Sequence, residues 1–260
     1  MKDYIGVDGL LHCGSCGGKK QTQIAVFGVK KIVPCVCACE EAARQKRQEA
    51  MTAAVNKARE AAERREAWGR KDLEKMTFEQ DDGREAWLMR ALKAYCRYFP
   101  DALKEGRGLL LYGGVGVGKT FGAACVINQL EKDGYKCMAT SFTRLLNTIG
   151  EHMDDRQTYL DGLKRHDLLM LDDYGTERRT EYAYEQLFEV IDARRRAGKP
   201  MIITTNLTRE QLTHPQSVQE QRLIERILEK CYPLEVKGAN RRRVGIRENS
   251  EEMKKIIKEM

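Results

Sequence analysis

A glycine-rich segment with one lysine and one threonine has the composition of a phosphate-binding loop. Its letters are GGVGVGKT, and it runs from Gly113 to Thr120. Closely spaced glycines let successive backbone N–H groups converge on phosphate oxygens, and a helix that begins there adds its positive end. In this motif Lys119 reaches the β- and γ-phosphates, and the hydroxyl of Thr120 binds Mg²⁺. The residues expected to line the nucleotide are Gly113, Gly114, Val115, Gly116, Val117, Gly118, Lys119, Thr120 and Phe121.

Two adjacent aspartates follow a continuous apolar run further along the chain. The run extends from Leu168 to Leu171, and Asp172 and Asp173 come directly after it. A fully apolar strand is buried on both faces, so its carboxyl end emerges at the sheet edge where α/β folds bind ligands. Asp172 is expected to hold the water shell of Mg²⁺, and Asp173 to orient or deprotonate the attacking water. The guanine-reading pattern Asn-Lys-x-Asp is absent from the sequence, which favours ATP over GTP.

A third apolar run, Met201 to Thr205, ends in Asn206. If this strand lies beside the one that precedes Asp172, the Asn206 amide points toward the γ-phosphate and the attacking water. An isolated asparagine after a strand is usually a turn residue. The repeated order of apolar strand and polar tip favours the functional interpretation.

Five of the nine cysteines fall near the start of the chain, at Cys13, Cys16, Cys35, Cys37 and Cys39. Thiols stay reduced inside cells, so such a cluster indicates a metal rather than disulfides. Cys13-x-x-Cys16 with a second pair predicts a closed, structural Cys₄ zinc site, which leaves no open position for catalysis. Three alternating cysteines compete for the second pair, and spacing alone allows either Cys35 with Cys37 or Cys37 with Cys39.

Strands and helices alternate from about residue 77, which predicts an α/β domain with a parallel sheet covered on both faces. The expected strands are 108–112, 136–140, 168–172, 201–205 and 233–236. The expected helices are 86–98, which ends before Pro100, then 119–132, a helix from 142, 181–197 and 220–230. The three arginines at 194–196 read as a solvated helix end.

The segment from residue 40 to 68 contains no glycine or proline and is rich in the best helix formers. Its thin apolar stripe, which includes Met51 and Val55, belongs either to a solvated connecting helix or to a helix that binds a partner. No apolar run approaches the roughly 18 residues of a membrane span, and the polar start is not a secretory signal. We therefore expect a soluble cytoplasmic protein with no membrane partner. The net charge of +7 gives a mild preference for polyanions.

The motifs in combination resemble the DnaC/DnaI-type helicase loaders, a branch of the AAA+ ATPases to which IstB-type transposition helpers are also similar. The resemblance is carried by DLLMLDDYGTE, EQLFEVIDARRRAGKP, MIITTNLT, RLIERI and VKGANRRR, and it covers about Thr77 to Arg243. It implies an AAA+ P-loop NTPase with a parallel five-stranded sheet and an ATP site completed by self-association with a neighbouring subunit.

The resemblance also implies roles for polar residues. Asn206 matches the first sensor, and Asp173 stands where most AAA+ proteins have glutamate, which fits a slowly hydrolysing switch. Arg226 in RLIERI matches the arginine finger that acts on a neighbour's ATP, with Arg222 a weaker match.

The second sensor arginine of the family matches Arg242 in GANRRR. The usual aromatic residue before it is replaced by Arg241, so Arg241 or Arg243 could take this role instead.

For the cysteines, the loader family has a Cys-x-Cys-Glu, which favours Cys37 and Cys39 as ligands and leaves Cys35 spare. The transposition helpers generally lack this zinc module. The expected organisation is a zinc module at 1–39, a helical linker or partner-binding segment at 40–76, an AAA+ domain at 77–247 and a C-terminal tail at 248–260.

The leading hypothesis is therefore an ATP-dependent loader that binds a hexameric replicative DNA helicase through its N-terminal region and single-stranded DNA through its AAA+ domain. Aromatic and cationic residues at 141–165, such as Phe142, Arg156 and Tyr159, could contact that DNA; an ordinary amphipathic helix pair is the alternative. The competing functions are an IstB-like transposition helper and a nucleotide-dependent interaction module with little turnover.

Overall fold

The computed structural model describes residues 2–68, 72–151, 155–175, 180–241, 253–254 and 257. The chain divides into two compact units, residues 1–62 and residues 63–260, and each is described by itself. None of the helices in these described stretches is both long and apolar enough to cross a membrane.

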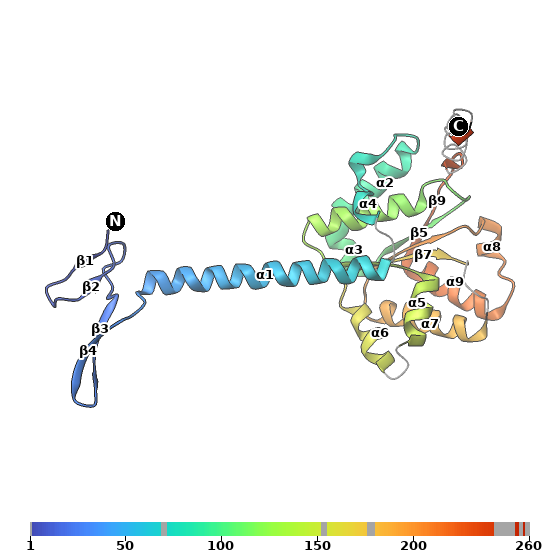
Figure 1. Ribbon diagram of the computed structural model, residues 1–260. Coiled ribbons are helices and arrows are strands. Elements are labelled where there is room, and N and C mark those ends of the chain that lie inside the picture. The colour runs from blue at the N-terminus through green and yellow to red at the C-terminus, as the bar shows by residue number, and fades with distance from the viewer. Residues whose placement is uncertain are drawn as a thin grey trace. The chain divides into compact units, whose positions relative to one another are not determined.

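The first unit consists of two small antiparallel sheets and most of one long helix (Figure 1). Strand β1 (Tyr4–Ile5) pairs with β2 (Leu11–His12), and β3 (Gln21–Val26) pairs with β4 (Val29–Pro34). Phe27 and Gly28 join β3 to β4 with φ values of 50° and 79°. Positive φ at both central residues is what a tight type I′ hairpin turn requires. Helix α1 (Ala38–Trp68) follows.

The second unit is built on a five-stranded parallel sheet, as the sequence predicted. Its strands are β5 (Gly108–Tyr112), β6 (Cys137–Ser141), β7 (Leu168–Tyr174), β8 (Met201–Thr205) and β9 (Cys231–Glu235). Their order is β6-β7-β8-β5-β9, with every neighbouring pair parallel. The strand that precedes the phosphate-loop motif, β5, therefore lies directly beside β8, the strand that precedes Asn206.

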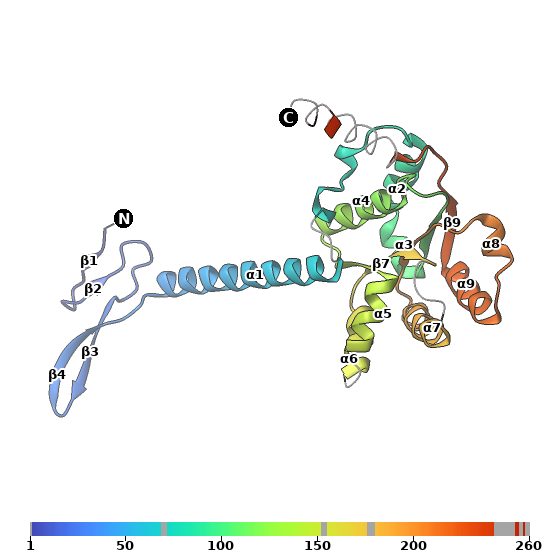
Figure 2. The same ribbon diagram turned by 45° about the vertical axis from the view of Figure 1, so that its right-hand side comes forward.

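Helices cover both faces of this sheet (Figures 1 and 2). Leu109 and Leu111 pack in a core with one set of helices, and Leu110 packs in a second core with the other set. The alternation of strand residues between two apolar cores explains why the strands read as continuous apolar runs. The first set is α2 (Ala86–Arg97), α3 (Phe99–Glu105) and α4 (Lys119–Lys132); the second is α5 (Phe142–Glu151), α6 (Arg156–Lys164), α7 (Glu181–Arg196), α8 (Arg209–Thr213) and α9 (Val218–Lys230). Two 3₁₀ turns, Leu73–Lys75 and Phe78–Gln80, precede them.

Pro100 has a different role from the one the sequence suggested. The helix predicted at 86–98 is present as α2, but a further helix, α3, begins at Phe99 and includes the proline in its first turn. A proline is tolerated there because its missing N–H would have no partner within the helix.

The arginines at the end of α7 are not uniformly solvated, and that interpretation is wrong for Arg194. Its side chain is fully buried and donates hydrogen bonds to the carbonyl oxygens of Leu163, His166 and Pro200, at 2.6 to 2.8 Å. These acceptors lie at the end of α6, before β7 and before β8. Arg194 therefore ties three connections of the sheet together.

Candidate ATP site and metal centre

The phosphate-loop motif forms the turn between β5 and the first residue of α4. Gly116 and Gly118 have φ values of 76° and 98°, which a residue with a side chain rarely adopts. The side chain of Lys119 is only 5% exposed. Its amine donates to the carbonyl oxygens of Gly113 and Gly114, at 2.8 and 2.6 Å, and to Oδ1 of Asn206 at 2.8 Å. The structure thus brings the predicted lysine and the predicted first-sensor asparagine together.

Thr120 and Asp172 also lie together. The Thr120 hydroxyl donates to Oδ1 of Asp172 at 2.9 Å, and Asp172 is only 5% exposed. One hydroxyl and one carboxylate beside a phosphate-binding loop are the oxygen donors that suit Mg²⁺. These two residues are the pair that would hold the ion with ATP, and the ion would offset the negative charge of the phosphates.

Asp173 has an unusual backbone conformation. Its φ of 60° lies in the left-handed region, which aspartate tolerates better than most residues. Its backbone N–H donates to the hydroxyl of Thr204 at 3.0 Å, and that hydroxyl donates to Oδ1 of Asp172 at 2.6 Å. Thr204 was absent from the predicted site. The only hint in the sequence was a polar residue near the end of an otherwise apolar strand.

The chain returns to the phosphate loop after β9. The backbone N–H of Arg241 donates to the carbonyl oxygen of Gly116 at 3.0 Å, and its guanidinium pairs with Asp82 at 3.2 Å. One guanidinium nitrogen, Nη2, is buried without a hydrogen-bond partner among the described residues. Arg242, the predicted second sensor, and Arg243 lie outside the described residues. Arg241 is therefore the arginine of this segment that the structure locates at the loop.

Together these residues fit a nucleoside triphosphate with its magnesium ion. The helix N-terminus, the Lys119 amine and the unpartnered Arg241 nitrogen supply donors and positive charge for phosphate oxygens. Thr120 and Asp172 supply acceptors for a cation.

Arg226, the predicted arginine finger, lies on α9 with a different set of neighbours. Its guanidinium pairs with Glu229 at 3.0 Å and with Asp192 at 3.8 Å, and it lies 5.9 Å from the centre of the Phe188 ring. A surface depression of about 520 Å³ lies here, lined by Phe188, Arg222, Glu225, Arg226 and Glu229. These ion pairs do not include the phosphate-loop residues.

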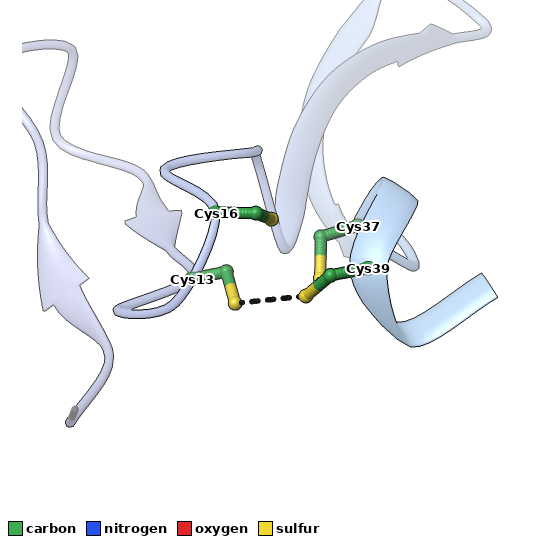
Figure 3. A group of neighbouring side chains, drawn as sticks. All are labelled: Cys13, Cys16, Cys37 and Cys39. Carbon is green, nitrogen blue, oxygen red and sulfur yellow. Dashed lines mark hydrogen bonds between the residues drawn. The ribbon is translucent and has the colours of Figure 1, made fainter. Parts of the chain in front are cut away.

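Four of the five N-terminal cysteines converge on one point. Cys13 and Cys16 project from the turn after β2, and Cys37 and Cys39 from the start of α1 (Figure 3). Their sulfur atoms all lie within 4.8 Å of one another. A tetrahedral zinc with Zn–S bonds of about 2.3 Å requires S···S separations of about 3.8 Å. Cys35 is not in the group, and its thiol donates to the carbonyl oxygen of Lys19 at 3.3 Å.

The chemistry of these thiols also suits a metal. Hydrogen bonds from the backbone N–H groups of Cys16 and Ser15 lower the pKa of the Cys13 thiol to about 6. The backbone N–H of Gly18 lowers the pKa of Cys16, and both shifts favour the thiolates that zinc binds. The surrounding thiols raise the pKa of Cys39 instead, because thiolates crowded together repel one another when no cation lies between them. The described apolar residues buried in this unit are Leu10, Cys13 and Cys37. So small a core cannot stabilise a fold by itself, and a bound ion would supply the missing free energy.

Several side chains of the segment expected to contact DNA, residues 141–165, are buried or already paired with other residues. Phe142 is fully buried and its ring packs 5.2 Å from that of Tyr174, so it cannot stack on a base. Arg156 pairs with Glu189. Two further residues of the 141–165 segment are a histidine and an arginine: His152 lies outside the described residues, and Arg165 is exposed at the end of α6.

The comparisons with known proteins agree with this geometry. The family model of the IstB-like ATP binding protein (IstB_IS21) matches residues 15–249. The replicative helicase loader DnaI of Bacillus subtilis is 31% identical over 150 residues, which are 53% of this chain and 48% of that protein. An ATP-binding protein of insertion sequence IS1162 from Pseudomonas fluorescens is 35% identical over 108 residues, which are 41% of this chain and 46% of that protein.

A crystal structure of DnaI superimposes with a TM-score of 0.55 at 25% identity, over 65% of this chain and 94% of that one. The matched part of the chain spans about half the length of the two curated relatives. The family match covers most of the sequence and includes the phosphate loop, the aspartate pair and Asn206. The chain therefore belongs to the IstB-like ATP binding protein family and is an AAA+ protein of the DnaC/DnaI type.

Proposed function

We propose that this protein is an ATP-controlled loader of a hexameric replicative DNA helicase. The observation that carries the proposal is the pairing of a DnaI-like ATP site with an N-terminal Cys₄ cluster. The ATP site is the switch, and the N-terminal unit binds the helicase.

Slow hydrolysis is part of this proposal. Asp173 is the carboxylate that orients or deprotonates the attacking water, and an aspartate reaches less far than the glutamate of most AAA+ proteins. Asn206 and an arginine after β9 sense the γ-phosphate from within the chain. Arg226 acts on the ATP of a neighbouring copy, which makes turnover depend on self-association.

The exposed surface of the N-terminal unit supports a protein partner. On one face of the β3–β4 hairpin, where Val26 pairs with Val29, the side chains Ile24, Val26 and Val29 are 41%, 37% and 59% exposed, and Phe27 at the tip is fully exposed. Apolar side chains grouped in this way are typical of a binding surface. Contact with the helicase through the hairpin is the specific form of the proposal.

The experiment mixes the zinc-loaded full-length chain with purified hexameric replicative helicase and measures the mass of the complex by light scattering. We expect a complex with the wild type and a weaker one with Phe27→Ser. The matched control is Tyr232→Ser, which removes another exposed aromatic side chain, 68% exposed on β9, from outside the hairpin. Absence of any complex with the wild type would refute the loader function.

The likeness to the IS1162 protein favours a second candidate, an ATP-dependent helper of DNA transposition. Such a protein would address a transposase instead of a helicase. Binding of a transposase in the same mass measurement, without binding of helicase, would favour this function. The same samples therefore separate the two candidates.

Single-stranded DNA is the second proposed ligand, bound by the AAA+ domain. Arg165 is an exposed cation near the end of α6, so Arg165→Glu is expected to weaken DNA binding. Arg196→Glu is the control, because Arg196 is an exposed arginine at the end of another helix. Equal loss in both variants would point to net charge rather than to a DNA site at α6.

A further inference from the structure

Thr204 lies at an irregularity in the sheet, directly opposite the two aspartates. In the pairing of β7 with β8, Leu171 faces Ile203 and Tyr174 faces Thr205. Asp172 and Asp173 therefore share a single opposing residue, Thr204, which is the arrangement of a β-bulge. A bulge interrupts the hydrogen bonds of the ladder and redirects a side chain, and bulges are frequent beside active sites.

The hydroxyl of Thr204 connects the two aspartates. It accepts the backbone N–H of Asp173 at 3.0 Å and donates its own proton to Oδ1 of Asp172 at 2.6 Å. The side chain is fully buried, so water does not compete for these bonds. A hydroxyl has one proton to donate, and here it is committed to Asp172.

We propose that Thr204 is a positioning residue for magnesium-dependent ATP hydrolysis, which fixes the Asp172 carboxylate and the left-handed backbone of Asp173 together. The inference rests on the proposed ATPase function and adds a residue to it. Asp172 Oδ1 also accepts the hydroxyl of Thr120. A bound Mg²⁺ would take the hydroxyl oxygen of Thr120 as a ligand, and Thr204 would then be the hydroxyl that holds Asp172, so its contribution should be greatest with the ion bound.

The neighbouring Thr205 provides a matched control. It is also fully buried on β8, but its hydroxyl donates to the carbonyl oxygen of Tyr174 at 2.8 Å and accepts the N–H of Leu207 at 3.1 Å. Thr→Val replaces a hydroxyl by a methyl group of similar size at either position. Only the change at Thr204 removes a bond to an aspartate of the site.

The test measures three quantities for wild type, Thr204→Val, Thr204→Ser and Thr205→Val: the melting temperature, the affinity for a fluorescent ATP analogue with EDTA or with Mg²⁺, and the Mg²⁺ concentration for half-maximal ATP hydrolysis. We expect Thr204→Val to bind the analogue normally in EDTA. Its half-maximal ATP hydrolysis should need about 10- to 100-fold more Mg²⁺ than that of wild type, as for residues that orient metal ligands. Thr204→Ser keeps the hydroxyl and should behave as wild type. Thr205→Val should lower the melting temperature without shifting the Mg²⁺ response.

A normal Mg²⁺ response in Thr204→Val, or an equal shift in Thr205→Val, would overturn the proposal. If Thr204→Val does not fold, Thr204→Ser and Thr204→Ala replace it, since both lose the methyl group and only serine keeps the hydroxyl. Equal Mg²⁺ responses in those two variants would overturn it as well. If wild type hydrolyses ATP no faster than Lys119→Ala, the ATPase function fails, while Mg²⁺-dependent binding of the analogue still tests Thr204.

Discussion

The amine of Lys119 lies 2.8 Å from the side-chain oxygen of Asn206, although 87 positions separate the two residues in the sequence. Parallel pairing of β5 with β8 produces this contact, because Tyr112 faces Thr205 and both strands end at the same edge. The lysine expected to meet the phosphates is thus in direct contact with the amide expected to sense them. A change at Asn206 should therefore affect ATP chemistry through Lys119.

Asn206→Asp and Asn206→Ala should have different effects. The aspartate would form a charge-assisted bond with Lys119 and add negative charge beside the phosphates, so ATP affinity should fall about tenfold or more. Alanine adds no charge, so ATP binding should be nearly normal while hydrolysis falls about 100-fold, as when one transition-state donor is removed. ATP titration and single-turnover hydrolysis measure the two effects. Equal ATP affinity in the two variants would contradict the assigned contact.

Substitutions at Asp172 and at Asp173 should affect different steps, the first Mg²⁺-dependent ATP binding and the second ATP hydrolysis. Asp172→Asn weakens the ligand set for Mg²⁺, so a higher Mg²⁺ concentration should be needed for tight ATP binding. Asp173→Asn leaves that set intact and removes the base, so ATP and Mg²⁺ should bind normally while hydrolysis falls about 100-fold or more. Nucleotide binding at graded Mg²⁺ and the hydrolysis rate are the readouts. A loss of Mg²⁺-dependent nucleotide binding in Asp173→Asn would contradict this assignment, because it would make Asp173 the residue that binds Mg²⁺.

The cysteine cluster predicts one bound zinc per chain, with Cys35 dispensable. Cys37→Ser removes one of the four converging sulfurs and should release the metal and unfold the N-terminal unit, because the ion supplies its folding free energy. Cys35→Ser is the matched control, a neighbouring cysteine outside the group. Zinc content by atomic absorption checks both. Loss of zinc in Cys35→Ser with retention in Cys37→Ser would show a different ligand set.

His166 should make the ATPase unit less stable in mild acid. Burial and the nearby charge of Arg194 lower the pKa of His166 below its usual value. The unfolded chain then binds more protons than the folded one between the lowered pKa and the usual value near 6.5, so stability falls as pH drops through that interval. His166→Gln should flatten this part of the pH profile of urea unfolding. An unchanged profile would exclude His166 as the cause.

Local motifs account for the part of the site that the sequence predicted. The predicted role of Gly113 to Thr120 depends on backbone geometry within one loop, and Asp172 follows its own apolar strand, so residue order was enough to predict that the two lie together. The strand–helix alternation likewise predicted the parallel sheet.

The features that the sequence missed depend on register and on contacts between distant segments. The contacts of Thr204 with Asp172 and Asp173 depend on a bulge in the pairing of β7 with β8, which residue types do not reveal. Arg194 looks like its neighbours Arg195 and Arg196 in sequence, and only the approach of three carbonyl oxygens explains its complete burial. Phe142 was expected to face DNA, but one face of its helix packs on the sheet.

The most direct test of the account is the transfer of a hexameric replicative helicase onto closed circular single-stranded DNA, which has no end for a ring to thread. The measurement is the amount of helicase retained on the circle after gel filtration, with the zinc-loaded chain and either ATP or no nucleotide. We expect wild type with ATP to increase the amount of retained helicase and Lys119→Ala to leave it unchanged. Retention that is the same with wild type, with Lys119→Ala and without the protein would contradict the account.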